Sequence, residues 1–175
     1  MFILLAIAVI VVVLVMVIVT RPADFSLSRS TTISAPPQAV FPQVNDLHNW
    51  EAWSPWAKID PAMKTTFAGP AAGTGSIYTW VGNNKVGAGR MTIVESRPSE
   101  LVRIKLEFMK PFAATNATEF TFQPQGNQTA VTWSMSGKRN FMSKAMSLVM
   151  SMEKMTGGQF ETGLQQMKAA VETRK

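Results

Sequence analysis

The chain's only histidine, His48, is the first residue to consider for chemistry, because an imidazole is able to act as a general base or bind a metal. It lies in the stretch LHNWEAWSPW, residues 47–56. The chain has no cysteine and no second histidine, and no group of Asp and Glu residues has the spacing of a metal site. We therefore expect no metal, no cofactor and no catalytic role for His48.

The acidic residues offer no clear acid–base pair. Asp46 and Glu51 flank one short helical segment, and Glu107 falls on the polar side of an alternating strand. Glu119 alternates with Phe120 and is predicted to point outward, although a register shift of one residue turns it inward. The predicted apolar faces contain no ionisable pair, so we lean towards a protein that is not an enzyme.

Three of the five tryptophans, Trp50, Trp53 and Trp56, lie close together. Trp50 and Trp53 are spaced to share one face of a helix, whereas Trp56 follows Pro55 and is expected to point elsewhere. The rings either pack short helices against a sheet, line the mouth of a cavity, or form a membrane-interface belt. We favour packing and expect at most one of the three rings to touch a ligand.

Charge and glycine patterns exclude several classes of partner. The net charge is +6, but the 17 basic residues are scattered, and no arginine-rich helix or RNA-binding signature is present, so we expect no nucleic-acid partner. Gly82, Gly87 and Gly89 flank a hairpin loop without the Gly-Lys-Ser/Thr of a phosphate loop. Mild attraction to anionic lipid headgroups is a simpler interpretation of the charge.

The first 20 residues, MFILLAIAVIVVVLVMVIVT, carry no charge. A 19-residue apolar helix is about 28 Å long, close to the bilayer's hydrocarbon thickness of about 30 Å. The basic start, short apolar core and cleavage site of a signal peptide are missing. We predict a transmembrane anchor at 1–20, a linker at 21–24 and one domain at 25–175. Arg21 and Arg29 favour a cytoplasmic domain at the cell membrane, but a domain of this length crosses regardless of flanking charge.

The rest of the chain predicts an α+β fold. Alternation and turn residues indicate strands at 25–34, 63–67, 76–82, 89–96, 101–108, 118–124 and 129–137. Two short helices are expected between the first two strands, and helical patterns follow at 141–155 and 160–172, with Gly157-Gly158 as a kink or interruption. This order predicts an antiparallel sheet with one solvent-exposed face and one face covered by the C-terminal helix.

The sequence resembles the START-like helix-grip superfamily, also called SRPBCC, and within it the bacterial polyketide cyclase/dehydrase branch. The matching stretches are APPQAVFPQVNDLHNWEAWSPW (35–56), GTGSIYTWVGNNKVGAGRMTI (73–93), FMKPFAATNATEFTF (108–122), VTWSMSG (131–137) and GGQFETGLQQMK (157–168). The resemblance implies a curved antiparallel sheet of about seven strands around a long C-terminal helix. It also implies a cavity between them for lipids, polyketides or other apolar molecules.

We therefore expect a membrane-anchored domain that binds a hydrophobic small molecule or lipid, in an unknown oligomeric state. The predicted cavity lining is Trp53, Tyr78, Trp80, Ile104, Phe120, Phe122, Trp133, Met135, Met146, Met150, Phe160 and Leu164. Two alternatives remain open. An acid–base pair inside the cavity favours a cyclase- or dehydrase-like enzyme, and a filled core favours a co-chaperone-like protein-interaction module.

Overall fold

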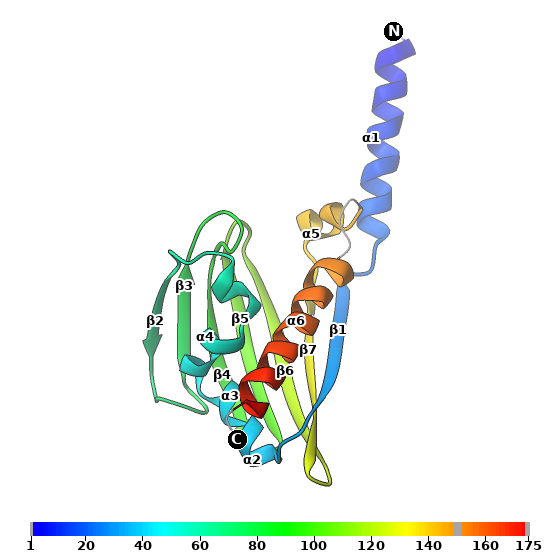
Figure 1. Cartoon of the computed structure of the whole chain (residues 1–175). Coiled ribbons are helices and arrows are strands. Elements are labelled where there is room, and N and C mark those ends of the chain that lie inside the picture. Colours follow the sequence, from blue (N-terminus) through cyan, green and yellow to red (C-terminus); the bar gives the residue numbers. More distant parts are fainter. Residues whose placement is uncertain (1, 149–151, 174–175) are drawn as a thin grey trace.

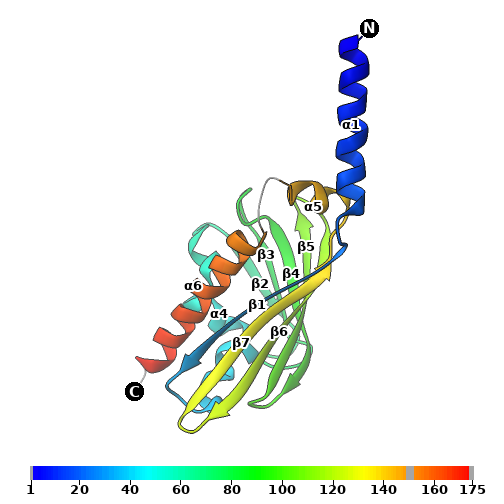
Figure 2. The same ribbon diagram turned by 90° about the vertical axis from the view of Figure 1, so that its right-hand side faces the viewer.

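The computed structural model describes residues 2–148 and 152–173. Seven strands form one sheet in the order β1-β7-β6-β5-β4-β3-β2, and every neighbouring pair is antiparallel. The strands are β1 (Asp24–Ile33), β2 (Lys64–Ala68), β3 (Ile77–Val81), β4 (Ala88–Arg97), β5 (Leu101–Lys110), β6 (Ala114–Gln125) and β7 (Gln128–Lys138). The curved sheet and the C-terminal helix that crosses it confirm the predicted helix-grip fold (Figures 1 and 2).

The predicted strand at 25–34 corresponds to β1, which is an edge strand of the sheet. β1 pairs with β7 alone, and Leu27 and Ile33 are its buried residues. The opposite edge, β2, has no buried residue. Since the strongly alternating strands occupy the centre of the sheet, the hydrophobic core lies there.

Proline divides the connection between β1 and β2 into five short helical turns rather than two short helices. They are α2 (Pro37–Val40), α3 (Pro42–Asn45), the 3-10 turn η1 (Leu47–Asn49), α4 (Trp50–Trp53) and the 3-10 turn η2 (Pro55–Lys58). Pro37, Pro42 and Pro55 each lie in a first turn, where a missing N–H is tolerated. Each proline restarts the chain in a new direction, and the turns run along one face of the sheet beside α6 (Figure 1).

The C-terminal part contains α5 (Phe141–Met146) and α6 (Met152–Glu172). The helix predicted to extend over 141–155 is therefore much shorter, and the break precedes Met152. The expected interruption at Gly157-Gly158 is wrong, because α6 continues through both glycines. Gly157 lies close to β1, because a Cβ built on it would meet the guanidinium of Arg29. The glycine makes room for a neighbour and does not end the helix.

The N-terminal helix, α1 (Phe2–Thr20), projects away from the domain (Figure 1). It is the one helix of the described residues that is long and apolar enough to cross a membrane, with a mean hydropathy of 3.7. Ile18 is its buried residue, and Lys144 of α5 donates to the carbonyl of Val19 at 3.1 Å. The last turn of α1 therefore contacts α5, whereas the rest of the helix is exposed.

Candidate functional site

The buried interface between the concave face of the sheet and α6, which we call the seam, brings most of the predicted cavity residues together. Nine of the twelve lie in one buried core: Trp53, Trp80, Ile104, Phe120, Phe122, Trp133, Met135, Phe160 and Leu164. Tyr78 is half-buried and packs against that core. Met146 lies apart on α5 and is 44% exposed, and Met150 falls outside the described residues.

Aromatic rings fill the centre of the seam. The rings of Trp133 on β7 and Phe160 on α6 stack with centroids 3.9 Å apart and an interplanar angle of 7°. Phe120 lies on the other side of Trp133, with the two centroids 4.8 Å apart. Trp56 also contacts both Trp133 and Phe160, so the expectation that it points elsewhere is wrong. The proline before Trp56 bends the chain back towards the sheet rather than away from it.

Trp50 and Trp53 secure the short turns, as predicted. Their ring centroids are 4.6 Å apart, and each ring meets Phe120 and Trp133 edge-on. The indole N–H of Trp50 donates to the carbonyl of Val44 at 3.1 Å, and that of Trp53 donates to the carbonyl of Gln43 at 2.8 Å. Both rings are thus buried with their polar atoms paired, which is typical of a packing role.

Other buried polar atoms of this region have no hydrogen-bond partner in the described structure. They are the indole N–H of Trp133, the hydroxyl of Thr118 and the side-chain carbonyls of Gln43 and Gln166. Thr118 precedes Phe120 by two residues on β6 and therefore shares its concave face. Sequence reasoning missed Thr118, although the alternation of Thr118, Phe120 and Phe122 was a usable signal. Unpaired buried polar atoms require an explanation, such as a ligand or a bound water.

The charged side chains of the central strands face the other side of the sheet. Arg103 bridges Glu119 at 2.7 Å and also pairs with Glu95, and the hydrogen bond that its guanidinium donates to Glu119 is the main cause that raises the pKa of Arg103. Lys105 contacts Glu107 at 2.8 Å, and this hydrogen bond lowers the pKa of that carboxyl. The predicted outward orientation of Glu107 and Glu119 is therefore confirmed.

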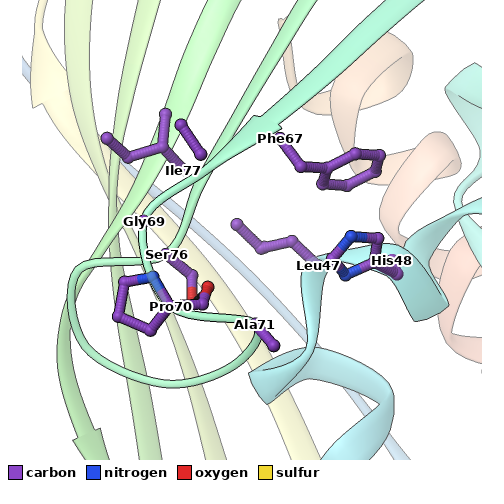
Figure 3. Close-up of a pocket in the computed structure, with 9 residues that line it drawn as sticks. Leu47, His48, Phe67, Gly69, Pro70, Ala71, Ser76 and Ile77 are labelled. Carbon is purple, nitrogen blue, oxygen red and sulfur yellow. Dashed lines mark hydrogen bonds between the residues drawn. The ribbon is translucent and has the colours of Figure 1, made fainter.

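His48 lies beside a small pocket of about 210 Å³ (Figure 3). The imidazole stacks on Phe67 with centroids 3.9 Å apart, and its Nδ1 is 2.8 Å from a carboxylate oxygen of Asp46. The same oxygen accepts from the backbone N–H of His48 and so caps η1. The hydroxyl of Ser76, also in the lining, donates to the carbonyl of Pro70 at 2.9 Å. These bonds form a structural turn and leave no activated nucleophile.

A second pocket, of about 310 Å³, lies between β1 and the start of α6. Arg29 and Arg139 line it together with Glu153. Arg29 pairs with Glu161 on α6 at 2.6 Å, and the guanidinium of Arg139 lies 5.4 Å from the centre of the Phe25 ring. Among the described residues, no group of three His, Cys, Asp or Glu residues is placed to hold a metal ion.

Tyr78 on β3 packs against the core, and its pKa is clearly shifted. Burial is the first cause that raises the pKa of its phenol, and the negative charge of Glu51 adds to it. The ring lies between Phe67, at 5.3 Å, and Trp80, at 6.1 Å. The phenol therefore stays protonated at neutral pH and is able to donate a hydrogen bond.

A family model described as "Polyketide cyclase / dehydrase and lipid transport" matches residues 24–172. The chain belongs to this family. The match begins at the first residue of β1 and ends at the last residue of α6, so it covers the whole sheet and the helix that grips it. The resemblance to the SRPBCC superfamily is thereby confirmed. No curated protein matches the chain.

Solved structures agree on the fold at low sequence identity. The Zhui aromatase/cyclase from Streptomyces sp. R1128 is 12% identical, with a TM-score of 0.64 over 86% of this chain and 95% of that one. The Aha1 dimer from Colwellia psychrerythraea is 14% identical, with a TM-score of 0.60 over 85% and 96%. A protein from Chromobacterium violaceum is 16% identical, with a TM-score of 0.61 over 84% and 96%. Because the names of these proteins do not indicate one common function, the structural similarity supports the fold alone.

Proposed function

We propose that the protein is a membrane-anchored domain that binds a hydrophobic small molecule or a lipid in its seam. The observation that carries the proposal is an apolar interface with unpaired polar atoms at its centre. Phe120, Trp133 and Phe160 supply apolar surface, and Thr118 and the indole N–H of Trp133 supply unused hydrogen-bonding capacity. Such a lining suits a mostly apolar ligand with a hydroxyl or carbonyl group. The family's description, which includes lipid transport, supports the same class of ligand.

A binding role is favoured over catalysis by the absence of an acid–base pair in the described part of the seam. The carboxylates of Glu107 and Glu119 face the opposite side of the sheet. Tyr78 is a neutral phenol with a raised pKa and has no basic partner among its ring contacts. General acid–base catalysis needs two positioned groups with suitable pKa values.

Ligand uptake requires the seam to widen. A pocket for a drug-sized ligand has a volume of about 300–1,000 Å³, and the Trp133 and Phe160 rings are in direct stacking contact. In this conformation the two stacked rings close the centre of the seam. Movement of α6 away from β7 would separate the two rings and expose the unpaired atoms of Thr118 and Trp133 to the ligand.

The anchor part of the proposal rests on α1, whose residues 2–19 are apolar and, except for Ile18, exposed. An exposed 19-residue apolar helix is stable in a bilayer, where its backbone hydrogen bonds are satisfied internally. A signal sequence has a similar apolar helix near the N-terminus. Resistance of the full-length protein to extraction from membranes by alkaline carbonate, together with an intact N-terminus, is the result expected for an anchor.

The ligand is tested by native mass spectrometry of residues 22–175. The buried core contains no residue of α1, so this fragment retains it. We expect a discrete lipid or apolar mass that co-purifies with the protein. A protein that is empty and does not bind a panel of lipids would exclude the proposal.

A matched pair of substitutions on β6 makes the test specific to the seam. Thr118→Val removes the unpaired hydroxyl, so the empty domain gains about 1–2 kcal/mol of stability while ligand binding weakens. Thr121→Val removes a hydroxyl from the opposite face of the same strand. We expect it to leave ligand binding unchanged. Equal effects of the two substitutions on binding would place the ligand elsewhere.

A second candidate function is a protein-interaction module. The filled seam favours this function, and the same fold occurs in Aha1, whose name does not describe it as a cyclase. The mass-spectrometry experiment separates the two candidates. An empty domain that captures a defined protein partner supports the module, whereas a bound apolar molecule supports the ligand-binding domain.

A further inference from the structure

The exposed apolar side chains of the domain are concentrated at the end from which α1 leaves. Outside α1, eight large apolar residues of the described chain are exposed, and only Phe67 and Val94 lie elsewhere. We call the other six the end patch: Val81, Met109, Phe112, Phe141, Met142 and Met146. Val81 ends β3, Met109 and Phe112 lie at the β5–β6 turn, and the last three belong to α5. Figures 1 and 2 show α5 beside the base of α1, and the ends of β3 and β5 lie at the same end of the sheet.

The segments that form the end patch are strongly basic. Residues 20–24, 81–88, 109–113 and 138–148 contain six basic residues and one acidic residue, Asp24. The basic residues are Arg21, Lys85, Lys110, Lys138, Arg139 and Lys144. An exposed apolar surface with a basic border is the composition of proteins that bind the surface of an anionic bilayer.

The connection to α1 is too short for the end patch to leave the membrane surface. Three residues, Arg21 to Ala23, separate α1 from β1, and they span at most about 10 Å. The headgroup layer on each side of a bilayer is about 5–8 Å thick. The carbonyl of Ala23 also accepts a hydrogen bond from the backbone N–H of Arg139 at 2.7 Å, so the connection is held against the end of β7.

The contact between α1 and α5 fixes the same orientation. Lys144 donates to the carbonyl of Val19, and Ile18 is buried at this junction. Phe141, Met142 and Met146 on α5 remain exposed beside it. With α1 in a membrane, these side chains lie at the depth of the headgroups and upper acyl chains, where apolar and aromatic groups gain from burial.

We propose that the end patch docks onto the surface of the bilayer that α1 spans, with its basic border in contact with anionic lipid headgroups. This inference rests on the anchor role of α1 in the proposed function. It adds a defined orientation: the end with the β5–β6 turn and α5 faces the membrane, and the β6–β7 turn at Gly126 points away from it.

Depth measurements on the full-length chain test the orientation. The chain has no cysteine, so each introduced cysteine is the one site for a spin label. Phe112→Cys and Met142→Cys report on the end patch. Val94→Cys is the matched control, because Val94 is 46% exposed on β4, outside the end patch, and Met142 is also 46% exposed. Val11→Cys reports on the middle of α1. The proteins are placed in nanodiscs of phosphatidylcholine and phosphatidylglycerol in equal amounts.

Accessibility to oxygen and to a water-soluble nickel chelate gives the outcome. We expect labels at 11, 112 and 142 to be more accessible to oxygen than to nickel, and the label at 94 to show the reverse. Nickel accessibility at 112 and 142 equal to that at 94, with the label at 11 inside the bilayer, overturns docking and leaves the anchor intact. A label at 11 that is accessible to nickel overturns both. Labels at 112 and 142 shielded from both reagents show a protein cover and overturn docking to lipid.

Charge reversal tests the anionic part of the proposal. Lys85→Glu combined with Lys110→Glu reverses two exposed charges of the basic border. We expect the label at 142 to become more accessible to nickel in nanodiscs that contain phosphatidylglycerol, and to remain unchanged in phosphatidylcholine alone. An unchanged label in both lipids overturns the role of the basic residues.

Discussion

Gly163 and Gly158 on α6 provide a sensitive test of how closely the seam is packed. A Cβ at Gly163 would lie 2.9 Å from a ring carbon of Trp133 and 3.1 Å from the ring of Pro55. At Gly158, no atom lies within 4 Å of the corresponding position. The two glycines belong to the same helix, so replacing each with alanine gives the same gain in helix propensity, about 1 kcal/mol.

The difference between Gly163→Ala and Gly158→Ala therefore isolates the packing term. Optimal carbon–carbon contact begins at about 3.5 Å, so the new methyl group at 163 overlaps Trp133 by about 0.6 Å. Both neighbours are rings packed in place and cannot rotate away, and overpacking of this kind costs about 1–3 kcal/mol. We expect Gly158→Ala to stabilise the domain by up to about 1 kcal/mol and Gly163→Ala to be neutral or destabilising by up to about 2 kcal/mol.

Urea unfolding of residues 22–175, followed by tryptophan fluorescence, measures both free energies of unfolding. The slope of the transition must be the same in the two variants for the comparison to be valid. If Gly163→Ala stabilises the domain as much as Gly158→Ala, the seam has room for a methyl group. That result would refute the closed seam and imply that a cavity already exists beside Trp133.

Three further perturbations have defined outcomes. Phe160→Ala is expected to lower the free energy of unfolding in urea by about 3–5 kcal/mol. Its control, Phe141→Ala, replaces a side chain that is 53% exposed and is expected to change that free energy by less than about 0.5 kcal/mol. A cost below about 1 kcal/mol at position 160 would contradict the stacked core. Asp60→Ala is expected to lower the free energy of unfolding by about 2 kcal/mol, because the buried carboxylate accepts hydrogen bonds from the backbone N–H groups of Asn83 and Ala62. Asp24→Ala, at an exposed residue, is the control. Equally small effects of the two substitutions would show that the bonds to Asp60 are dispensable. Tyr78, the only tyrosine, is expected to ionise above pH 10 in the folded domain and at about pH 10 in denaturant, as followed by absorbance at 295 nm. The stability linked to this group is fully present below pH 10 and is lost as the pH rises through the folded pKa. An unshifted titration would mean that the phenol is solvated.

The sheet was predictable from the sequence because a half-buried strand alternates with a period of two residues. The segment LVRIKLEF predicted a strand at 101–108, and β5 extends over Leu101–Lys110. The same alternation placed Glu107 and Glu119 on the outer face, and their ion pairs confirm it. Local pattern was sufficient here because each side chain's face depends only on its position in the strand.

The helical regions were less predictable because their geometry depends on distant neighbours. Gly157 was interpreted as a helix interruption, but it lies within α6 beside Arg29, which precedes it by 128 positions in the chain. Trp56 joins the aromatic stack because β7 and α6 bring Trp133 and Phe160 to it. No local pattern records such contacts, so the sequence predicted which residues are apolar but not how their rings meet.

The two proposals together predict where the seam opens. Among the α6 side chains whose burial the structure describes, the buried ones are Phe160, Leu164, Met167 and Val171, so the C-terminal part of the helix is held by the core. At its N-terminal end, Glu153 and Lys154 are exposed, and Glu153 pairs with Arg29 at 3.6 Å across the 310 Å³ pocket.

An exposed ion pair of this kind contributes at most about 1 kcal/mol, whereas withdrawal of the buried Phe160 side chain from the core costs several times more. Opening is therefore expected to begin between β1 and the start of α6, and the Arg29–Glu161 pair and the Trp133–Phe160 stack separate in a later step. With the end patch docked, this mouth lies beside the membrane, and an apolar ligand would pass from the bilayer into the seam along a short path. Weakening the pair with Glu153→Gln is accordingly expected to speed ligand uptake from vesicles without changing the affinity for the bound molecule.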